Sequence, residues 1–206
     1  PNTDGLNLEG VGVKVNLNGV LVNEKLQTTH SRIYACGGIV TGYSPFNIAQ
    51  AEVDIILKNI LFYPWFKINY THLPYCLFIH PTIARVGLIE KQARQYKNEI
   101  CVISMPYKMN AQAQISGETT GFIKLIINEQ GYLLGGHIIG VQAEEIISAI
   151  ALAIQHKISI QSLAKLPLPS LTVSVIIHQA ALYYQNQSLQ KNKKLLNWYE
   201  TWLIWQ

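Results

Sequence analysis

The first third of the chain alternates short apolar runs with turn residues and then changes to helical spacing. β-Branched runs at 11–16 and 20–23 flank Asn18-Gly19, a pair typical of the turn of a β-hairpin. Residues 32–36 form a further short apolar run that predicts a strand. Between Pro45 and Phe62 the apolar residues recur with a helical period: Ile48, Ala51, Ile55, Ile56 and Ile60. The pattern therefore predicts a hairpin, a strand and one helix.

The remaining pattern predicts strands first and helices later. Strands are expected at 75–79, 100–107, 121–128 and 132–140, and helices at 89–96, 143–156, 160–165 and 171–184. This order favours an α+β fold, with an antiparallel sheet and helices on one face. Pro64 and residues 65–70 interrupt the pattern. We therefore expect three parts, at 1–68, 69–188 and 189–206.

Composition restricts the class of protein. The 206 residues are 49% hydrophobic and 14% charged, which is enough apolar material for a folded core. A net charge of +4 does not favour nucleic-acid binding. The chain shows no apolar run of membrane-spanning length and no secretory signal. Three widely spaced cysteines and isolated histidines predict neither a disulfide framework nor a metal site, so a cytoplasmic location is expected.

Several segments occur in an order that resembles a known family. They are 28–38, 44–45, 73–94, 117–126, 133–140, 143–147 and 151–154. This order resembles the C-terminal region of the pyridine nucleotide–disulfide oxidoreductases, the family of mercuric reductase and dihydrolipoamide dehydrogenase. The resemblance covers roughly residues 1–185. It implies a remnant of an FAD-binding domain, followed by a dimerisation domain that forms a homodimer. It also implies that the parent protein uses FAD and NAD(P)H.

The same resemblance implies a cofactor contact at Gly37, Gly38 and Ser44. Family members usually carry Gly-Asp where this chain has Gly37-Gly38, and the aspartate binds the polar linker of the cofactor. Glycine removes that acceptor but keeps a close backbone approach possible. The alternative is an ordinary strand–turn–helix corner.

Besides Gly38 in place of the aspartate, two further differences from the family argue against catalysis by this chain alone. The FAD-binding GxGxxG motif, the redox-active cysteine pair and the nicotinamide-binding domain are absent from its 206 residues. Pro1-Asn2 resembles the end of a family motif, which suggests a piece of a longer protein. Many members also carry a histidine oriented by a glutamate where Leu168 and Val173 stand, and neither of these residues transfers protons. We therefore predict a dimerisation fragment without catalytic residues, or alternatively a degenerate interaction module.

Two amphipathic segments leave alternatives open. The helix at 143–156 has an apolar stripe of Ile146, Ile147, Ile150, Ala151 and Ile154. This stripe could pack on its own sheet or meet its copy across a two-fold axis. The tail places Leu195, Trp198, Tyr199, Trp202 and Trp205 on one helical face after a lysine cluster. Such a tail could cover the protein body, or it could bind a membrane surface.

Overall fold

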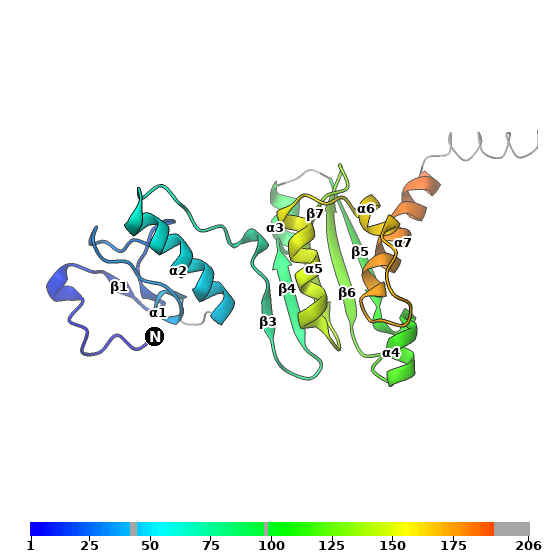
Figure 1. Ribbon diagram of the computed structural model, residues 1–206, viewed down its shortest axis with the longest axis horizontal. Helices are drawn as coiled ribbons and strands as arrows, with labels where there is room; N and C mark the ends of the chain where they lie inside the picture. The colour runs from blue at the N-terminus through cyan, green and yellow to red at the C-terminus, as the bar shows by residue number, and fades with distance from the viewer. Residues whose placement is uncertain (42–44, 97–98, 192–206) are drawn as a thin grey trace, which may run out of the picture. The chain divides into compact units, whose positions relative to one another are not determined.

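The computed structural model describes residues 1–41, 45–96 and 99–191, so the tail from residue 192 lies outside the described residues (Figure 1). The chain divides into two compact units, Pro1–Tyr75 and the part that begins at Cys76. The predicted boundary at 68/69 stays a prediction. Each unit is considered by itself below.

Unit 1 contains the predicted hairpin and helix but not the predicted strand at 32–36. Its elements are η1 (Glu9–Val11), β1 (Val15–Asn16), β2 (Gly19–Val20), α1 (Gly38–Thr41), α2 (Phe46–Leu61) and η2 (Tyr70–His72). The hairpin forms, but its turn residues are Leu17 and Asn18, one position before the predicted pair, and Gly19 begins β2. The Asn16 side chain accepts hydrogen bonds from the N–H groups of Asn18 and Gly19. The strand prediction was wrong. Only an isolated bridge between Gln27 and Tyr34 forms there, in which the N–H groups of Thr28 and Ala35 donate to the carbonyls of Ile33 and Leu26, and the pairing does not extend into a ladder.

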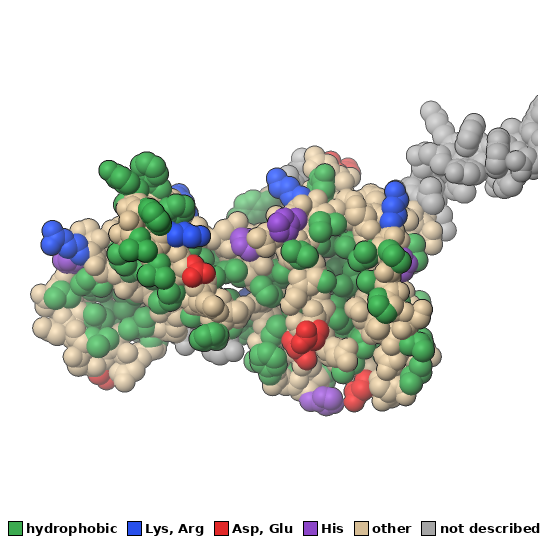
Figure 2. Space-filling model, in the orientation of Figure 1, with side chains coloured by type: hydrophobic (Ala, Val, Ile, Leu, Met, Phe, Trp, Pro, Cys, Tyr) green, Lys and Arg blue, Asp and Glu red, His purple; other side chains and the backbone are tan. Residues whose placement is uncertain are grey.

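Helix α2 carries polar residues within its inward face, among the half-buried Ile48, Ala51, Ile55 and Ile56. The two residues that it buries are polar, Glu52 and Asn59. The apolar side chains at its C-terminal end and in the following turn are exposed: Ile60, Leu61, Phe62, Tyr63 and Trp65. Figure 2 shows hydrophobic side chains gathered over this end of the helix. The periodicity therefore predicted the helix and the face that it turns inward, although Ile60 is exposed and the most buried residues of that face are Glu52 and Asn59.

Unit 2 is built on a five-stranded antiparallel sheet. Its strands are β3 (Tyr75–Leu77), β4 (Ile83–Gly87), β5 (Ile100–Pro106), β6 (Phe122–Asn128) and β7 (Leu133–Ile139). They lie in the order β3-β4-β7-β6-β5. The register pairs Ile123 with Ile138 and Leu125 with Gly136, so the predicted β6–β7 hairpin is confirmed. Strand β4 was not predicted.

The helices of unit 2 are α3 (Glu90–Tyr96), η3 (Tyr107–Met109), α4 (Ala111–Ser116), α5 (Ala143–Gln155), α6 (Ile160–Lys165) and α7 (Val175–Lys191). Helix α7 begins four residues later than the 171–184 prediction, because Leu171 has a left-handed backbone with φ of 58°. Helices α4 and η3 were not predicted.

The predicted α+β fold is confirmed. Helix α5 packs on β4 and β7, and α7 packs on β5 and β6 (Figure 1). Their shared core includes Ile123, Leu125 and Ile138 from the sheet. Helix α3 lies on the opposite face, where its Glu90 reaches Lys124, which alternates with the core residues Ile123 and Leu125.

Candidate functional site

The predicted cofactor corner begins at Gly37. Its backbone has φ of 72°, a conformation that side-chain-bearing residues rarely adopt. Its N–H donates to Oε2 of Glu52 at 2.6 Å, and its carbonyl accepts from the N–H of Val40 at 3.0 Å. Both backbone groups of Gly37 are therefore hydrogen-bonded inside the protein, and a cofactor contact at this residue stays a prediction.

Gly38 has a different environment from Gly37. It is the first residue of α1, and a Cβ added there would meet no heavy atom of the described residues within 4 Å. The backbone of Gly38 does not require glycine, so the structure has room at this position for the aspartate that family members usually carry. Of the three predicted cofactor residues, Gly37 and Gly38 form one corner, whereas Ser44 lies outside the described residues.

Two residues of this corner were not among the predicted site residues. Glu52 on α2 is fully buried, and its Oε1 accepts from the hydroxyl of Tyr70 at 2.7 Å. Burial, followed by the hydrogen bond and the charge of Glu52, raises the pKa of Tyr70. Burial and then the Glu52 carboxylate also raise the pKa of the Cys36 thiol. One signal in the sequence could have identified Glu52: it is an acidic residue within the apolar stripe, three and four positions before Ile55 and Ile56.

The apolar stripe of α5 packs inside unit 2. Ile146, Ile147 and Ile150 are 3%, 1% and 1% exposed, and they belong to the core between α5 and the sheet. Of the two alternatives for this stripe, these residues follow the first, packing on their own sheet. Leu152 on the same helix remains 53% exposed.

Asn110 holds the segment 166–173 by hydrogen bonds to its backbone. This is the segment in which the family pattern has a histidine and a glutamate. Val173 is buried in the core, and Leu168 lines an open cavity of about 380 Å³ together with His178 and Gln179. Asn110, 1% exposed, donates from Nδ2 to the carbonyls of Thr172 and Val173 at 3.1 and 3.3 Å. The segment is thus held in place through its backbone.

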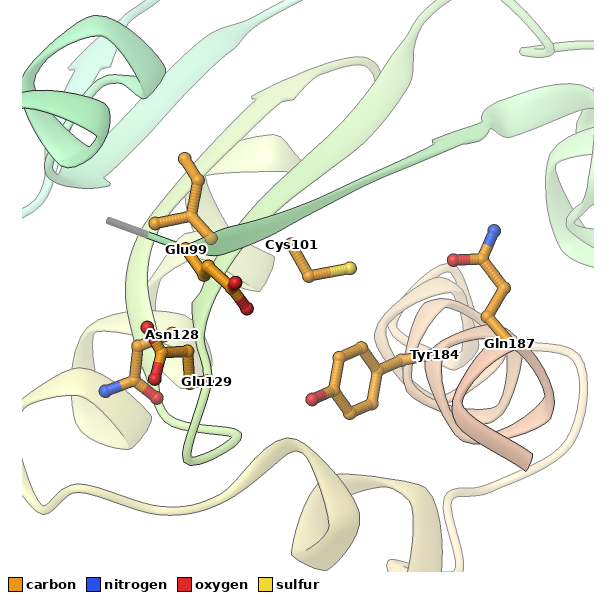
Figure 3. A pocket seen from close by; sticks show the side chains of 7 residues that line it. Glu99, Cys101, Asn128, Glu129, Tyr184 and Gln187 are labelled. Carbon is orange, nitrogen blue, oxygen red and sulfur yellow. The ribbon is translucent and has the colours of Figure 1, made fainter. Parts of the chain in front are cut away.

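A second cavity, of about 240 Å³, lies between the end of the sheet and α7 (Figure 3). Cys101 on β5 faces Tyr184 and Gln187 of α7, with Glu99 and Glu129 on the rim. Burial, followed by the nearby Cys101, raises the pKa of Tyr184. Within residues 1–41, 45–96 and 99–191, no three His, Cys, Asp or Glu side chains are grouped as metal ligands.

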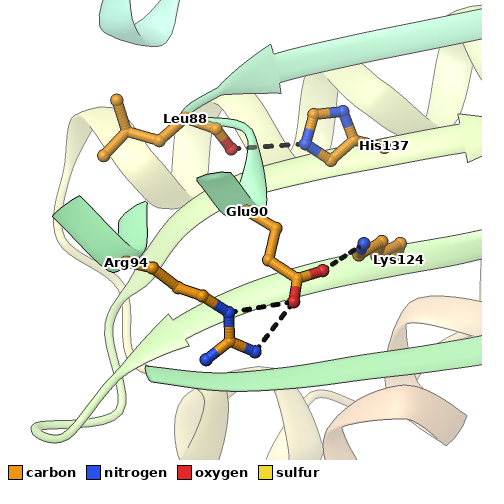
Figure 4. A network of polar contacts seen from close by, with 5 residues as sticks. All are labelled: Leu88, Glu90, Arg94, Lys124 and His137. Carbon is orange, nitrogen blue, oxygen red and sulfur yellow. Dashed lines mark hydrogen bonds and ion pairs between the residues drawn. The ribbon is translucent and has the colours of Figure 1, made fainter. Parts of the chain in front are cut away.

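Charged side chains lie on the face of the sheet opposite to α5 and α7 (Figure 4). Glu90 binds Lys124 and also Arg94, the latter at 2.8 Å, and these cations hold the pKa of Glu90 below its ordinary value. Glu90 and Arg94 are four residues apart, so their side chains lie on the same side of α3. His137 donates from Nε2 to the carbonyl of Leu88 at 3.2 Å and pairs in register with Arg85 and Lys124.

The position of His137 predicts a pH-dependent stability. Burial lowers its pKa, as do the Lys124 and Arg85 charges, although the Leu88 carbonyl opposes them. The unfolded chain therefore binds the proton more tightly than the folded chain. Stability is expected to fall as pH drops below about 6.5, the ordinary value for histidine, and to level off below the lowered pKa.

Urea titrations between pH 5 and 8 would check this expectation. His137→Gln keeps a donor for the Leu88 carbonyl but cannot gain a proton, so the difference in stability between variant and wild type should change across this range. Parallel curves for the two proteins would contradict the role of His137.

No helix in the described part of the chain has the length and apolar character needed to cross a membrane.

Comparisons with known proteins agree with this geometry. Residues 73–181 match the family described as pyridine nucleotide-disulphide oxidoreductase, dimerisation domain. Mercuric reductase of Staphylococcus aureus is 38% identical over 186 residues, which cover 89% of this chain and 34% of that protein. Dihydrolipoyl dehydrogenase of Geobacillus stearothermophilus is 31% identical over 166 residues, which cover 80% of this chain and 35% of that protein.

A solved structure has the same fold. The crystal structure of LpdA from Mycobacterium tuberculosis superimposes with a TM-score of 0.79 at 28% identity, covering 89% of this chain and 40% of that one. The chain therefore spans about a third of the length of the curated relatives it matches.

Proposed function

Because this chain belongs to the pyridine nucleotide–disulphide oxidoreductase family and contains its dimerisation domain, we propose that it forms the homodimer contact of a larger flavoprotein. That flavoprotein resembles mercuric reductase and passes electrons from NAD(P)H through FAD to a disulfide or thiol-bound acceptor. The chain alone has no turnover in this proposal. The observation that carries it is the match of residues 73–181, which spans unit 2 from β3 into α7.

The exposed apolar side chains of unit 1 support the proposal that it is part of a larger FAD-binding domain. Its buried apolar residues are Val13, Val20 and Leu26, whereas α2 and the turn after it expose many large apolar side chains. Burying those side chains against further polypeptide would be favourable. The three free cysteines fit a reducing cytoplasm, which we include in the proposal.

The Gly37–Gly38 corner has the shape that a close cofactor approach requires. Gly37 makes the turn, and the space beside Gly38 is open. In this proposal the corner contacts FAD in the parent protein, where the flavin would supply two-electron transfer. Gly38 would come near the cofactor through its backbone.

Gly38→Asp tests the corner. An added carboxylate is expected to tighten FAD binding by the intact protein about tenfold, since a hydrogen bond to a charged acceptor contributes about 1.5–3 kcal/mol. Flavin fluorescence during FAD titration of the apoprotein measures the change. Gly38→Asn, which carries an uncharged acceptor, is the matched control. Unchanged affinity in both variants would contradict a cofactor contact at this corner.

The dimerisation proposal predicts a dimer of the chain itself. Light scattering across a dilution series should give a mass near twice 23.2 kDa. The same preparation should not reduce a dye acceptor with NADPH. A monomer at every concentration would contradict self-association through this chain, and robust dye reduction would contradict the lack of turnover.

The segment at 166–173 favours one alternative, a degenerate module that keeps the dimer contact without chemistry. Val173 is 3% exposed and packed in the core, so its side chain offers no orienting carboxylate. The DNA upstream of Pro1 separates the two proposals. A GxGxxG motif and a cysteine pair there favour the flavoprotein, and their absence favours the module.

A further inference from the structure

We propose that Glu52 is the positioning residue of the cofactor corner, holding the Gly37 peptide in the orientation in which the corner meets FAD. This rests on the proposed function of that corner. Glu52 acts through the Gly37 backbone and makes no contact with the cofactor in this proposal, so it is not a catalytic residue.

The environment of Glu52 is unusual for a carboxylate. The side chain is fully buried, and its two oxygens accept from the Gly37 N–H and the Tyr70 hydroxyl. The ion pairs found among the described residues do not include Glu52. A buried carboxylate held only by neutral donors is costly, whereas an apolar side chain on this helix face would avoid that cost. The retained carboxylate therefore points to a role at the peptide it binds.

Hydrogen bonds from Tyr70 and Gly37 hold the Glu52 carboxylate in place, an arrangement that we call the clamp. Glu52 lies within α2, a helix of 16 residues, so its backbone is held by the helix. Tyr70 is 18 positions further along the chain and fixes the second carboxylate oxygen. The oxygen that faces Gly37 is thus held from two sides. The bond stabilises one orientation of the peptide at a glycine, a residue that permits a wide range of backbone angles.

Asn59 provides a matched control on the same helix. It is also buried, and it clamps a different backbone segment, bonding to the N–H and carbonyl of Phe66 at 2.9 Å each. Replacing Asn59 removes a buried polar clamp from α2 but leaves the bond between Glu52 and Gly37 in place. Comparing the variants of Glu52 and Asn59 therefore distinguishes a general destabilisation of unit 1 from a specific effect on the Gly37–Gly38 corner.

The first experiment uses this chain and three variants: Glu52→Ala, Glu52→Gln and Asn59→Ala. Amide hydrogen exchange at Gly37, followed by NMR, is expected to accelerate about tenfold or more in Glu52→Ala, because a bond to a charged acceptor is lost. Glu52→Gln, which can still accept from Gly37, should restore most of the protection. Asn59→Ala should leave it unchanged. Unchanged exchange in Glu52→Ala, or equal acceleration in Asn59→Ala, would overturn the clamp.

Cys36 gives an independent signal of the Glu52 charge. Site-resolved alkylation rates against pH should shift to lower pH in Glu52→Gln, because the negative charge beside the thiol is removed. Asn59→Ala should keep the wild-type profile. A profile in Glu52→Gln identical to that of wild type would contradict a charged Glu52 at this corner.

The second experiment measures FAD affinity in the intact flavoprotein. Glu52→Ala is expected to raise the FAD dissociation constant about tenfold, with Glu52→Gln and Asn59→Ala close to wild type. If Gly37 exchange responds in the chain but FAD affinity does not change, the clamp stands and the cofactor role of the corner is overturned. The two results therefore distinguish failure of this inference from failure of the proposed function.

Discussion

Ile150→Ala is expected to lower the free energy of unfolding of unit 2 by about 2–5 kcal/mol, the range for a fully buried isoleucine. Ile150 is 1% exposed and lies over Gly136 of β7, where an added Cβ would fall 2.7 Å from its Cγ2. This close contact leaves little room for neighbours to fill the cavity. Urea denaturation followed by circular dichroism measures the loss.

Leu152→Ala is the matched control for Ile150→Ala. Leu152 lies on the same helix but is 53% exposed, so its truncation is expected to cost about 1 kcal/mol or less. Equal losses in the two variants would contradict the packing of α5. If Leu152→Ala also weakens the dimer seen by light scattering, then the exposed face of α5 takes part in self-association.

Asn110→Ala is expected to destabilise unit 2 by about 2–4 kcal/mol, because one side chain makes several buried bonds. Its Oδ1 caps α4 by accepting from the N–H of Ala113 at 3.0 Å, while its Nδ2 binds the carbonyls of Thr172 and Val173. The variant removes the partners of these groups, which are buried or partly buried. The midpoint of urea denaturation should fall accordingly.

A second helix cap in unit 2, made by Ser159, provides a reference for the loss of stability in Asn110→Ala. Ser159 caps α6 through a single bond from the N–H of Ser162 at 3.2 Å, at an exposed site. Ser159→Ala is expected to cost only about 0.5–1 kcal/mol. A loss in Asn110→Ala no greater than this would show that the bonds to the 166–173 segment contribute little to stability.

Local chemistry decided much of the fold. The β1–β2 hairpin, the helix from Phe46 and the β6–β7 hairpin were predicted because their signals lie within a few neighbouring residues. The strand at 32–36 failed for the opposite reason. An apolar run becomes a strand only if a partner strand lies beside it, and here the pairing is limited to one bridge between Gln27 and Tyr34.

The candidate site was predicted only in part. Gly37 and Gly38 followed from the resemblance, and they lie in one corner with the turn that the resemblance implies. Glu52 and Tyr70 were missed because they are 15 and 33 positions from Gly37, and no local pattern links them. Only the folded chain brings their side chains to one peptide.

The sequence by itself determined the kinds of elements, their order and the family, since periodicity, turn chemistry and ordered motifs are properties of neighbouring residues. Tertiary structure decided how fully the inward face of each helix is buried. The stripe of α5 packs on its own sheet, whereas the stripe of α2 is only half-buried and surrounds the fully buried Glu52 and the buried Asn59. Periodicity shows that a helix has two faces, but what covers each face depends on segments far away in the chain.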